Sequence, residues 1–160
     1  MTELMVDPVP SAGLPEAEYI ELFNRTEWLL DLKDCRLLSA RDTLKMEKYL
    51  LYPGEYYLLC ATSKISVFSE NINKIGLRPF PSLLNRDQEL SLLNPDDALV
   101  FSIHYSDRWY REPDRAGGGY SLEMIDPENP CGGAGNWRAS VMDIGGTPGM
   151  INSRSEERRV

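Results

Sequence analysis

The amino-acid sequence predicts an all-β fold, a β-sandwich with one short helix and long loops. Short stretches with a period-two apolar pattern recur along the chain, as in strands with one buried face. The 12 glycines and 11 prolines among the 160 residues separate these stretches, which is typical of two packed sheets joined by turns. The length suits one domain. We assign residues 1–153 to this domain and residues 154–160 to a tail or linker.

The central unit of the predicted fold is the stretch 19–24, Tyr-Ile-Glu-Leu-Phe-Asn. Its apolar residues alternate with a period of two, so it should form a strand with one strongly apolar face. We expect Glu21, on the other face, to accept hydrogen bonds from backbone or tyrosine donors. Asn24 should end the strand, because its side chain can bond the backbone two residues further on. The extended pattern restarts at Cys35 and Leu37.

Further short strands should flank this unit. Residues 4–6 form a candidate first strand, and the charged stretch 41–48 is a loop or an edge strand. Pro53 followed by Gly54 suits the two central positions of a type II turn. Residues 56–61 are aromatic and aliphatic, which predicts a buried strand.

The best helix candidate is the segment 63–71. Ser63 can cap its start. Ile65, Phe68 and Ile72 recur at spacings of three and four, which is the period of a helix with one apolar face.

A hairpin and a last strand complete the predicted elements. The stretches 89–93 and 99–105 flank the turn-forming residues 94–97. Residues 120–125 form another strand, and Trp137 should anchor the loop-rich remainder of the domain.

The net charge of −8 and the acidic pI of 4.7 argue against non-specific binding to DNA or anionic membranes, which needs clustered lysine and arginine. A local patch of Arg108, Arg111 and Arg115 leaves nucleic-acid binding open as an alternative. No run of apolar residues approaches the length of about 18 that a membrane-spanning helix needs, so we expect no membrane insertion.

The three cysteines, Cys35, Cys60 and Cys131, lack the CxxC spacing of a zinc site. We interpret two of them as small core residues and one as a loop thiol. A disulfide between Cys35 and Cys60 remains open, since their strands can be neighbours.

No catalytic residue, cofactor or metal site is predicted. His104 is the only histidine, and nothing local supplies the nucleophile or carboxylate at hydrogen-bond reach that a general base needs. The glycine runs 117–119 and 132–135 lack the Lys-Ser/Thr ending of a phosphate loop. Residues 94–97 offer oxygen ligands that calcium prefers, but they are first of all turn formers.

The best candidate for an exposed contact site is Trp109, Tyr110 and Arg111. Aromatic residues and arginine are enriched at interface hot spots, and the surrounding loop is strongly polar, as an interface rim would be. The alternative is that Trp109 folds back onto the end of the predicted sandwich.

Several short motifs occur in a fixed order between residues 3 and 153, namely 19–24, 31–37, 51–56, 80–85, 90–93, 119–127, 136–137 and 145–152. Together they resemble the lamin tail domain, the immunoglobulin-like module of nuclear lamins and many bacterial proteins, and most closely its Bacteroidetes branch. The fold-signature residues of this resemblance are Glu21, Asn24, Pro53, Gly54, Trp137, Gly146, Pro148 and Gly149. The chain departs from the family at Cys35, where tryptophan is common, and at Phe101, where an acidic residue often stands.

The resemblance implies an immunoglobulin-like β-sandwich that acts as a non-catalytic interaction or adhesion module of a larger, exported bacterial protein. The implied location is periplasmic, cell-surface or secreted, with a cytoplasmic location not excluded. Its partner would be a protein or a cell-surface polymer. A nucleic-acid-associated module, as in lamins or in family members joined to nucleases, is the alternative. The family supplies no catalytic residues to carry over.

Overall fold

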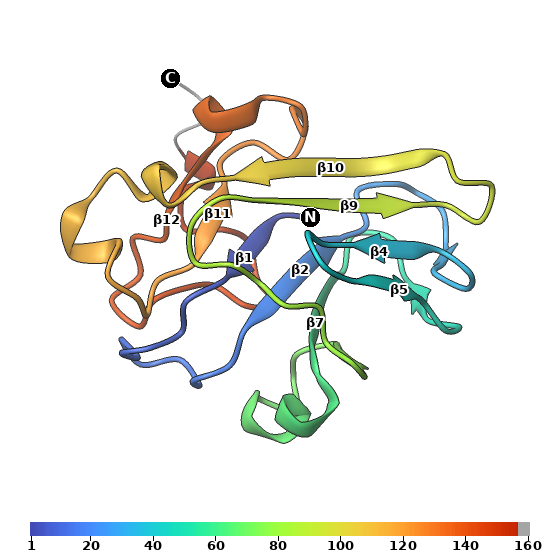
Figure 1. Cartoon of the computed structure of the whole chain (residues 1–160), viewed down its shortest axis with the longest axis horizontal. Helices are drawn as coiled ribbons and strands as arrows, with labels where there is room; N and C mark the ends of the chain where they lie inside the picture. The colour runs from blue at the N-terminus through green and yellow to red at the C-terminus, as the bar shows by residue number, and fades with distance from the viewer. Residues whose placement is uncertain (157–160) are drawn as a thin grey trace.

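The computed structural model describes residues 1–156, which form two larger sheets and a two-stranded ribbon (Figure 1). The larger sheet has the strand order β12 (Trp137–Ala139), β11 (Leu122–Met124), β1 (Glu3–Met5), β2 (Tyr19–Phe23), β7 (Tyr56–Ala61) and β8 (Lys74–Leu77). The smaller sheet has the order β10 (Leu99–Tyr105), β9 (Gln88–Leu93), β4 (Arg36–Leu38) and β5 (Thr43–Lys45). The ribbon pairs β3 (Leu30–Asp31) with β6 (Leu50–Leu51). The prediction of an all-β fold is confirmed at this level.

The predicted helix at 63–71 is wrong. In its place lies a short 3₁₀ helix, η1 (Thr62–Val67), preceded by Ala61 and without a side-chain cap. Phe68 is buried against Tyr19, with ring centroids 5.8 Å apart. The apolar spacing therefore reflects a loop folded onto the sheet. Within residues 1–156, no helix is both long and apolar enough to cross a membrane.

The main core lies between the two larger sheets. Each sheet contributes one face of alternating apolar residues, including Leu4, Ile20, Leu22 and Leu59 from the larger sheet and Leu37, Leu90, Leu92 and Ile103 from the smaller one. A second cluster, which includes Tyr19, Leu58, Cys60 and Phe68, covers the other face of the larger sheet. The period-two pattern of stretch 19–24 is thus confirmed, since its alternate residues belong to different faces.

A hydrogen-bonded corner takes the chain from the larger sheet to the smaller one after β2. Asn24 Oδ1 accepts a bond from the Thr26 amide at 3.0 Å, as predicted for this residue. Asn24 Nδ2 also donates to the carbonyls of Trp28 and Leu51, each at 2.8 Å. Asn24 therefore fixes both the strand end and the neighbouring ribbon.

The predicted turn at Pro53 and Gly54 packs against this corner. The Glu55 amide donates to the Tyr52 carbonyl at 3.3 Å, and Gly54 has a φ of 72°, as the third residue of a type II turn requires. The Gly54 amide also donates to the Asn24 carbonyl at 2.8 Å.

The predicted hairpin is confirmed as β9 and β10, which pair in antiparallel fashion. Asn94 Oδ1 accepts bonds from the amides of Asp96 at 3.0 Å and Ala98 at 2.9 Å. Asp97 forms an ion pair with Arg36. These residues therefore act in the turn itself, in agreement with their interpretation as turn formers.

The cysteines are all free thiols. Cys35 belongs to the core between the sheets, whereas Cys60 belongs to the second cluster on the opposite face of the larger sheet. A disulfide between them is absent, and Cys131 is exposed. The interpretation as two core residues and one loop thiol is confirmed.

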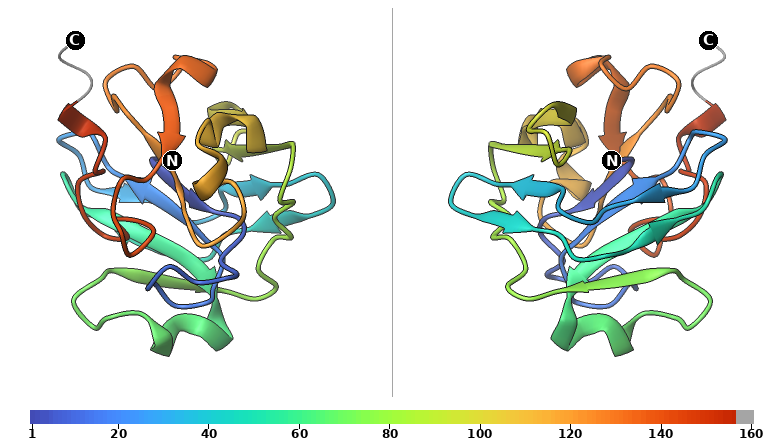
Figure 2. Two further views of the ribbon diagram at one scale, coloured as in Figure 1. Left: turned by 90° about the vertical axis from the view of Figure 1, so that its left-hand side faces the viewer. Right: turned by 90° about the vertical axis from the view of Figure 1, so that its right-hand side faces the viewer.

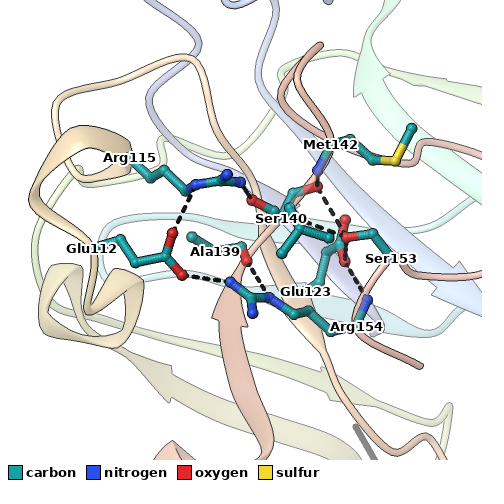
Figure 3. Close-up of polar contacts among 9 residues, drawn as sticks. Glu112, Arg115, Glu123, Ala139, Ser140, Met142, Ser153 and Arg154 are labelled. Atoms are coloured by element: carbon teal, nitrogen blue, oxygen red, sulfur yellow. Dashed lines mark hydrogen bonds and ion pairs between the residues drawn. The ribbon is translucent and has the colours of Figure 1, made fainter. Parts of the chain in front are cut away.

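The C-terminal segment lies on the side of the larger sheet that faces away from the smaller sheet (Figure 2). We call residues 145–154 the strap. Arg154, expected in a tail, is buried and donates through Nε to the Ala139 carbonyl at 2.8 Å (Figure 3). Its Nη2 pairs with Glu112 at 2.6 Å. Arg154 therefore belongs to the packed structure, because its charge finds a partner 42 residues away in the sequence. Residues 157–160 of the expected tail lie outside the described residues.

Candidate functional site

The predicted contact site of Trp109, Tyr110 and Arg111 does not form an exposed aromatic surface. These residues lie at the end of the 3₁₀ helix η2 (Asp107–Tyr110), and Tyr110 is buried. Trp109 packs beside Trp137 with ring centroids 6.3 Å apart, as the alternative expected. Arg111 is exposed, but its Nη2 donates to the Ala134 carbonyl at 2.8 Å. Both aromatic rings therefore pack against the main core.

The three arginines of this region do not gather into a free basic patch either. Arg115 pairs with Glu112 at 2.8 Å and donates to the Ser140 carbonyl (Figure 3), and Arg111 is held as described above. Only Arg108 among the three has no side-chain partner within residues 1–156. A phosphate backbone would therefore find little free positive charge here.

His104 and the two glycine runs lie in separate parts of the fold. His104 is exposed on β10, opposite Glu89 of β9. The glycine run 117–119 forms a turn packed on the backbone of Val9 and Pro10. The run 132–135 lies in and before the short 3₁₀ helix η4 (Gly133–Asn136). Within the described part of the chain, no group of three histidine, cysteine or acidic residues could hold a metal ion.

The strongest candidate site is an apolar groove at one end of the molecule. It has a volume of about 270 Å³ and lies between the end of β2, the ribbon and the start of β10. Its apolar walls come from several separate segments and include Met1, Leu22, Phe23, Leu30, Leu32, Leu51, Leu92, Val100 and Phe101. A neighbouring hollow, also of about 270 Å³, shares Met1, Phe23, Leu30, Val100 and Phe101 and extends to Pro127 and Pro130.

Exposed apolar residues adjoin the groove residues Leu30 and Val100 in the sequence. Trp28 is 74% exposed and Leu29 is 50% exposed on the loop before β3. Leu99 and Val100 are 62% and 58% exposed at the start of β10. We define the groove surface as the groove walls together with Trp28, Leu29 and Leu99.

Three acidic residues stand in or next to the segments that form the groove surface. Glu27, Asp31 and Asp96 are exposed and have no ion-pair partner within residues 1–156. The nearby Arg25 pairs with Glu128 at 3.9 Å, and Arg36 pairs with Asp97. A ligand with basic groups would therefore be attracted to this end.

The sequence contains one signal for this surface. Residues 28–30 are three consecutive large apolar residues between Glu27 and Asp31. Asn24 holds the carbonyl of Trp28, which keeps this loop in place while the indole ring stays in solvent. The groove itself could not be predicted, because its walls are distant in sequence.

The fold-signature residues lie mostly away from the groove. Trp137 is buried in the core between the sheets. Gly146, Pro148 and Gly149 belong to the strap, and the Gly149 amide donates to Glu21 Oε2 at 2.7 Å. Glu21 thus receives the backbone hydrogen bond expected for it, but it is fully buried beneath the strap.

No protein-family model matches the chain, and no curated protein matches it in sequence.

Proposed function

We propose that this chain is a non-catalytic interaction module that binds an extended apolar segment of another protein. The observation that carries the proposal is the open apolar groove, together with the exposed Trp28 two residues before the groove residue Leu30. Contiguous apolar surface of this kind is a mark of interaction sites in soluble proteins, and tryptophan is enriched among the residues that dominate binding energy.

The size and charge of the groove favour a particular occupant. A volume of about 270 Å³ is at or below the roughly 300–1,000 Å³ of pockets for drug-sized ligands. It suits one or two apolar side chains better than a whole small molecule. The acidic residues Glu27, Asp31 and Asp96 favour lysine or arginine next to those side chains.

Strand β10 offers a way for such a segment to bind. It is the outer strand of the smaller sheet, so one of its edges has no strand partner within residues 1–156. Its seven residues include no lysine, arginine, acidic residue or proline, the residues that usually protect a free edge. An added strand at Leu99–Phe101 would direct alternate side chains toward the groove.

The setting we propose is a larger, exported bacterial protein in the periplasm, at the cell surface or in the medium. The order of the sequence motifs supports an immunoglobulin-like sandwich similar to the lamin tail domain, and the two facing sheets are compatible with it. A cell-surface polymer or a nucleic acid as the partner would appear as a different outcome of the experiment below.

The experiment is a selection of 12-residue peptides from a random displayed library on the whole chain. We expect the selected peptides to alternate apolar residues and to carry lysine or arginine. The variant Val100→Glu should weaken their binding at least tenfold, whereas the matched variant Val67→Glu, at a valine exposed on η1, should bind normally. The variant Trp28→Ala should also bind the selected peptides at least tenfold more weakly, which corresponds to about 1.4 kcal/mol of binding free energy.

Equal binding by the two glutamate variants would exclude the groove as the contact site. A single-stranded DNA oligonucleotide and a soluble glycan panel serve as competing probes in the same assay. Salt-sensitive binding of the oligonucleotide, with no peptide selected, would favour the nucleic-acid module instead.

A further inference from the structure

Three glutamates form a row inside the protein, on the face of the larger sheet beneath the strap. Glu3 of β1 lies opposite Glu21 of β2 on one side and opposite Glu123 of β11 on the other. All three residues have 0% exposure. Neighbouring strands are about 4.8 Å apart, so three ionised carboxylates here would repel one another strongly out of contact with water.

No ion pair within residues 1–156 includes Glu3, Glu21 or Glu123. The guanidinium group of Arg154 donates to the Ala139 carbonyl and pairs with Glu112, and the Arg154 backbone amide donates to Glu123 at 3.2 Å (Figure 3). The α-amine of Met1 lies near Glu21, but burial lowers its pKa to about 5, so it is mostly uncharged at neutral pH. No metal-binding group exists in this part of the chain either.

The strap binds to the row through its backbone and hydroxyl groups. The amides of Thr147 and Gly149 donate to Glu3 at 2.9 Å and to Glu21 at 2.7 Å. Ser153 Oγ donates to Glu123 at 2.6 Å. The row is therefore the surface on which the strap is held.

The contacts of the Thr147 hydroxyl limit the protonation states that Glu3 and Glu123 can have together. Its Oγ1 lies 3.1 Å from Glu3 Oε2 and 3.0 Å from Glu123 Oε1, with Asn152 farther away at 3.5 Å. A hydroxyl has one proton to donate. If both carboxyls were ionised, one of these two short contacts would have no hydrogen between its oxygens.

One proton on either of the two facing oxygens resolves this conflict, and we place it on Glu3 Oε2. Glu3 then donates to Thr147 Oγ1, and Thr147 donates to Glu123 Oε1. Oε1 of Glu3 already accepts from Tyr19 at 2.7 Å, Ser121 at 2.6 Å and the Thr147 amide, so Oε2 is the oxygen left for the proton. Burial, followed by the nearby Glu123, raises the pKa of Glu3 to about 7, in agreement with this assignment.

We propose that the glutamate row and the strap form a proton-dependent latch. A proton on Glu3, passed on as a hydrogen bond through Thr147, holds the strap on the larger sheet. Loss of this proton leaves two facing carboxylates with one hydrogen between them, and the strap loosens. The latch does not depend on the groove surface.

The direction of the pH dependence follows from proton binding. An ordinary glutamate has a pKa of 4.5, so between pH 4.5 and about 7 the folded protein holds the Glu3 proton that the unfolded chain releases. The latch is therefore complete below about pH 4.5 and weakens up to about tenfold per pH unit as the pH approaches 7. Burial and Glu3 raise the pKa of Glu21 in the same direction.

Other groups titrate in the same range and must be controlled. The lowered pKa of the Met1 amine, about 5 against 8, acts in the opposite direction, so the protein should carry an acetylated N-terminus. Burial and the nearby Asp7 raise the pKa of Glu18 to about 7. Because Glu18 is present in every variant, its effect cancels when the protection of Glu3→Gln is divided by that of the original sequence. Tyr19 stays protonated, because burial beside Glu3 raises its pKa well above 10.

The test is hydrogen exchange of the Thr147 amide in the acetylated whole chain and in Glu3→Gln. The glutamine amide donates to Thr147 at every pH. We expect equal protection of this amide near pH 5 and at least tenfold greater protection in Glu3→Gln at pH 7.5. The variant Glu123→Gln has a single accepting oxygen, which cannot serve both Thr147 and Ser153, so it should lose protection at both pH values.

Protection that falls in parallel in the two proteins, or does not fall in either, would overturn the proposal. If Glu3→Gln fails to fold, the chain labelled with ¹³C at glutamate carboxyls decides the question. Titration of the Glu3 signal near pH 7 supports the latch, and titration near pH 4.5 contradicts it.

Discussion

Asn24 illustrates how one side chain can hold two elements together. It is 2% exposed and uses all of its side-chain hydrogen-bonding groups, on the Thr26 amide and hydroxyl and on the carbonyls of Trp28 and Leu51. If the Asn24 side chain is removed, the Leu51 carbonyl in the protein interior loses its hydrogen-bond donor. An unpaired buried polar group costs about 1–3 kcal/mol.

We therefore expect Asn24→Ala to lower the free energy of unfolding by about 2–3 kcal/mol in urea denaturation. The matched variant is Asn94→Ala, because the Asn94 side chain bonds only to two amides of its own turn. Its loss should be no more than about 1 kcal/mol. Equal losses would mean that the corner does not depend on the Asn24 amide.

At the scale of single residues, the sequence predicted local chemistry well and exposure poorly. The bonds of Asn24 and the φ of Gly54 involve neighbours in the chain, so residue type alone was informative. The burial of Tyr110 and the packing of Trp109 depend on Trp137, which is 28 residues beyond Trp109. The exposure of Trp28 is likewise set by the tertiary structure, because it depends on whether a distant segment covers the ring.

Among the elements, the strands were predictable and the helix was not. The residues of β2 and β7 alternate because successive side chains pack into two different clusters, one on each face of the larger sheet. The spacing of Ile65, Phe68 and Ile72 has a second explanation, because a loop lying on a sheet can place the same residues inward. Periodicity over nine residues does not distinguish a helix with one apolar face from a loop packed on a sheet.

The strap depends on a close approach that only glycine allows. A Cβ at Gly146 would lie 2.6 Å from Glu3 Oε1 and 2.7 Å from the Tyr19 hydroxyl. We expect Gly146→Ala to push the strap off the sheet and to lower the free energy of unfolding by about 1–3 kcal/mol, as measured by urea denaturation. Gly117→Ala is the control, since a Cβ there meets nothing within 4 Å and should change stability by less than about 0.5 kcal/mol. An unchanged free energy of unfolding in Gly146→Ala would show that the strap is not tightly held on the sheet.

The whole molecule combines segments that no local pattern connects. Glu3 faces Glu123, and Thr147 bonds to Glu3 from 144 residues away. The groove likewise joins Leu22, Leu30 and Val100 from three separate elements. The sequence predicted the all-β class, since that follows from the sum of local patterns. It could not predict the groove or the proton of the glutamate row, because both arise only when distant strands become neighbours.

The two apolar clusters should open together, because β7 belongs to both. Leu59 lies in the core between the sheets, and the next residue, Cys60, lies in the second cluster. Cys60 is 0% exposed, and burial raises the pKa of its thiol. A thiol reagent should therefore reach Cys60 only when β7 leaves both clusters, which means global unfolding.

The measurement is labelling of the whole native chain with N-ethylmaleimide, followed by mass spectrometry of each cysteine peptide. Cys131 should react at once, because it is exposed. The labelling rate of Cys60 should rise with urea as steeply as the equilibrium unfolding constant does. Cys35 lines the groove, so its labelling rate should depend less on the urea concentration. In guanidinium chloride all three should react at similar rates. A Cys60 rate that does not depend on urea would mean that the second cluster opens alone, and β7 would then not join the two faces of the molecule into one cooperative unit.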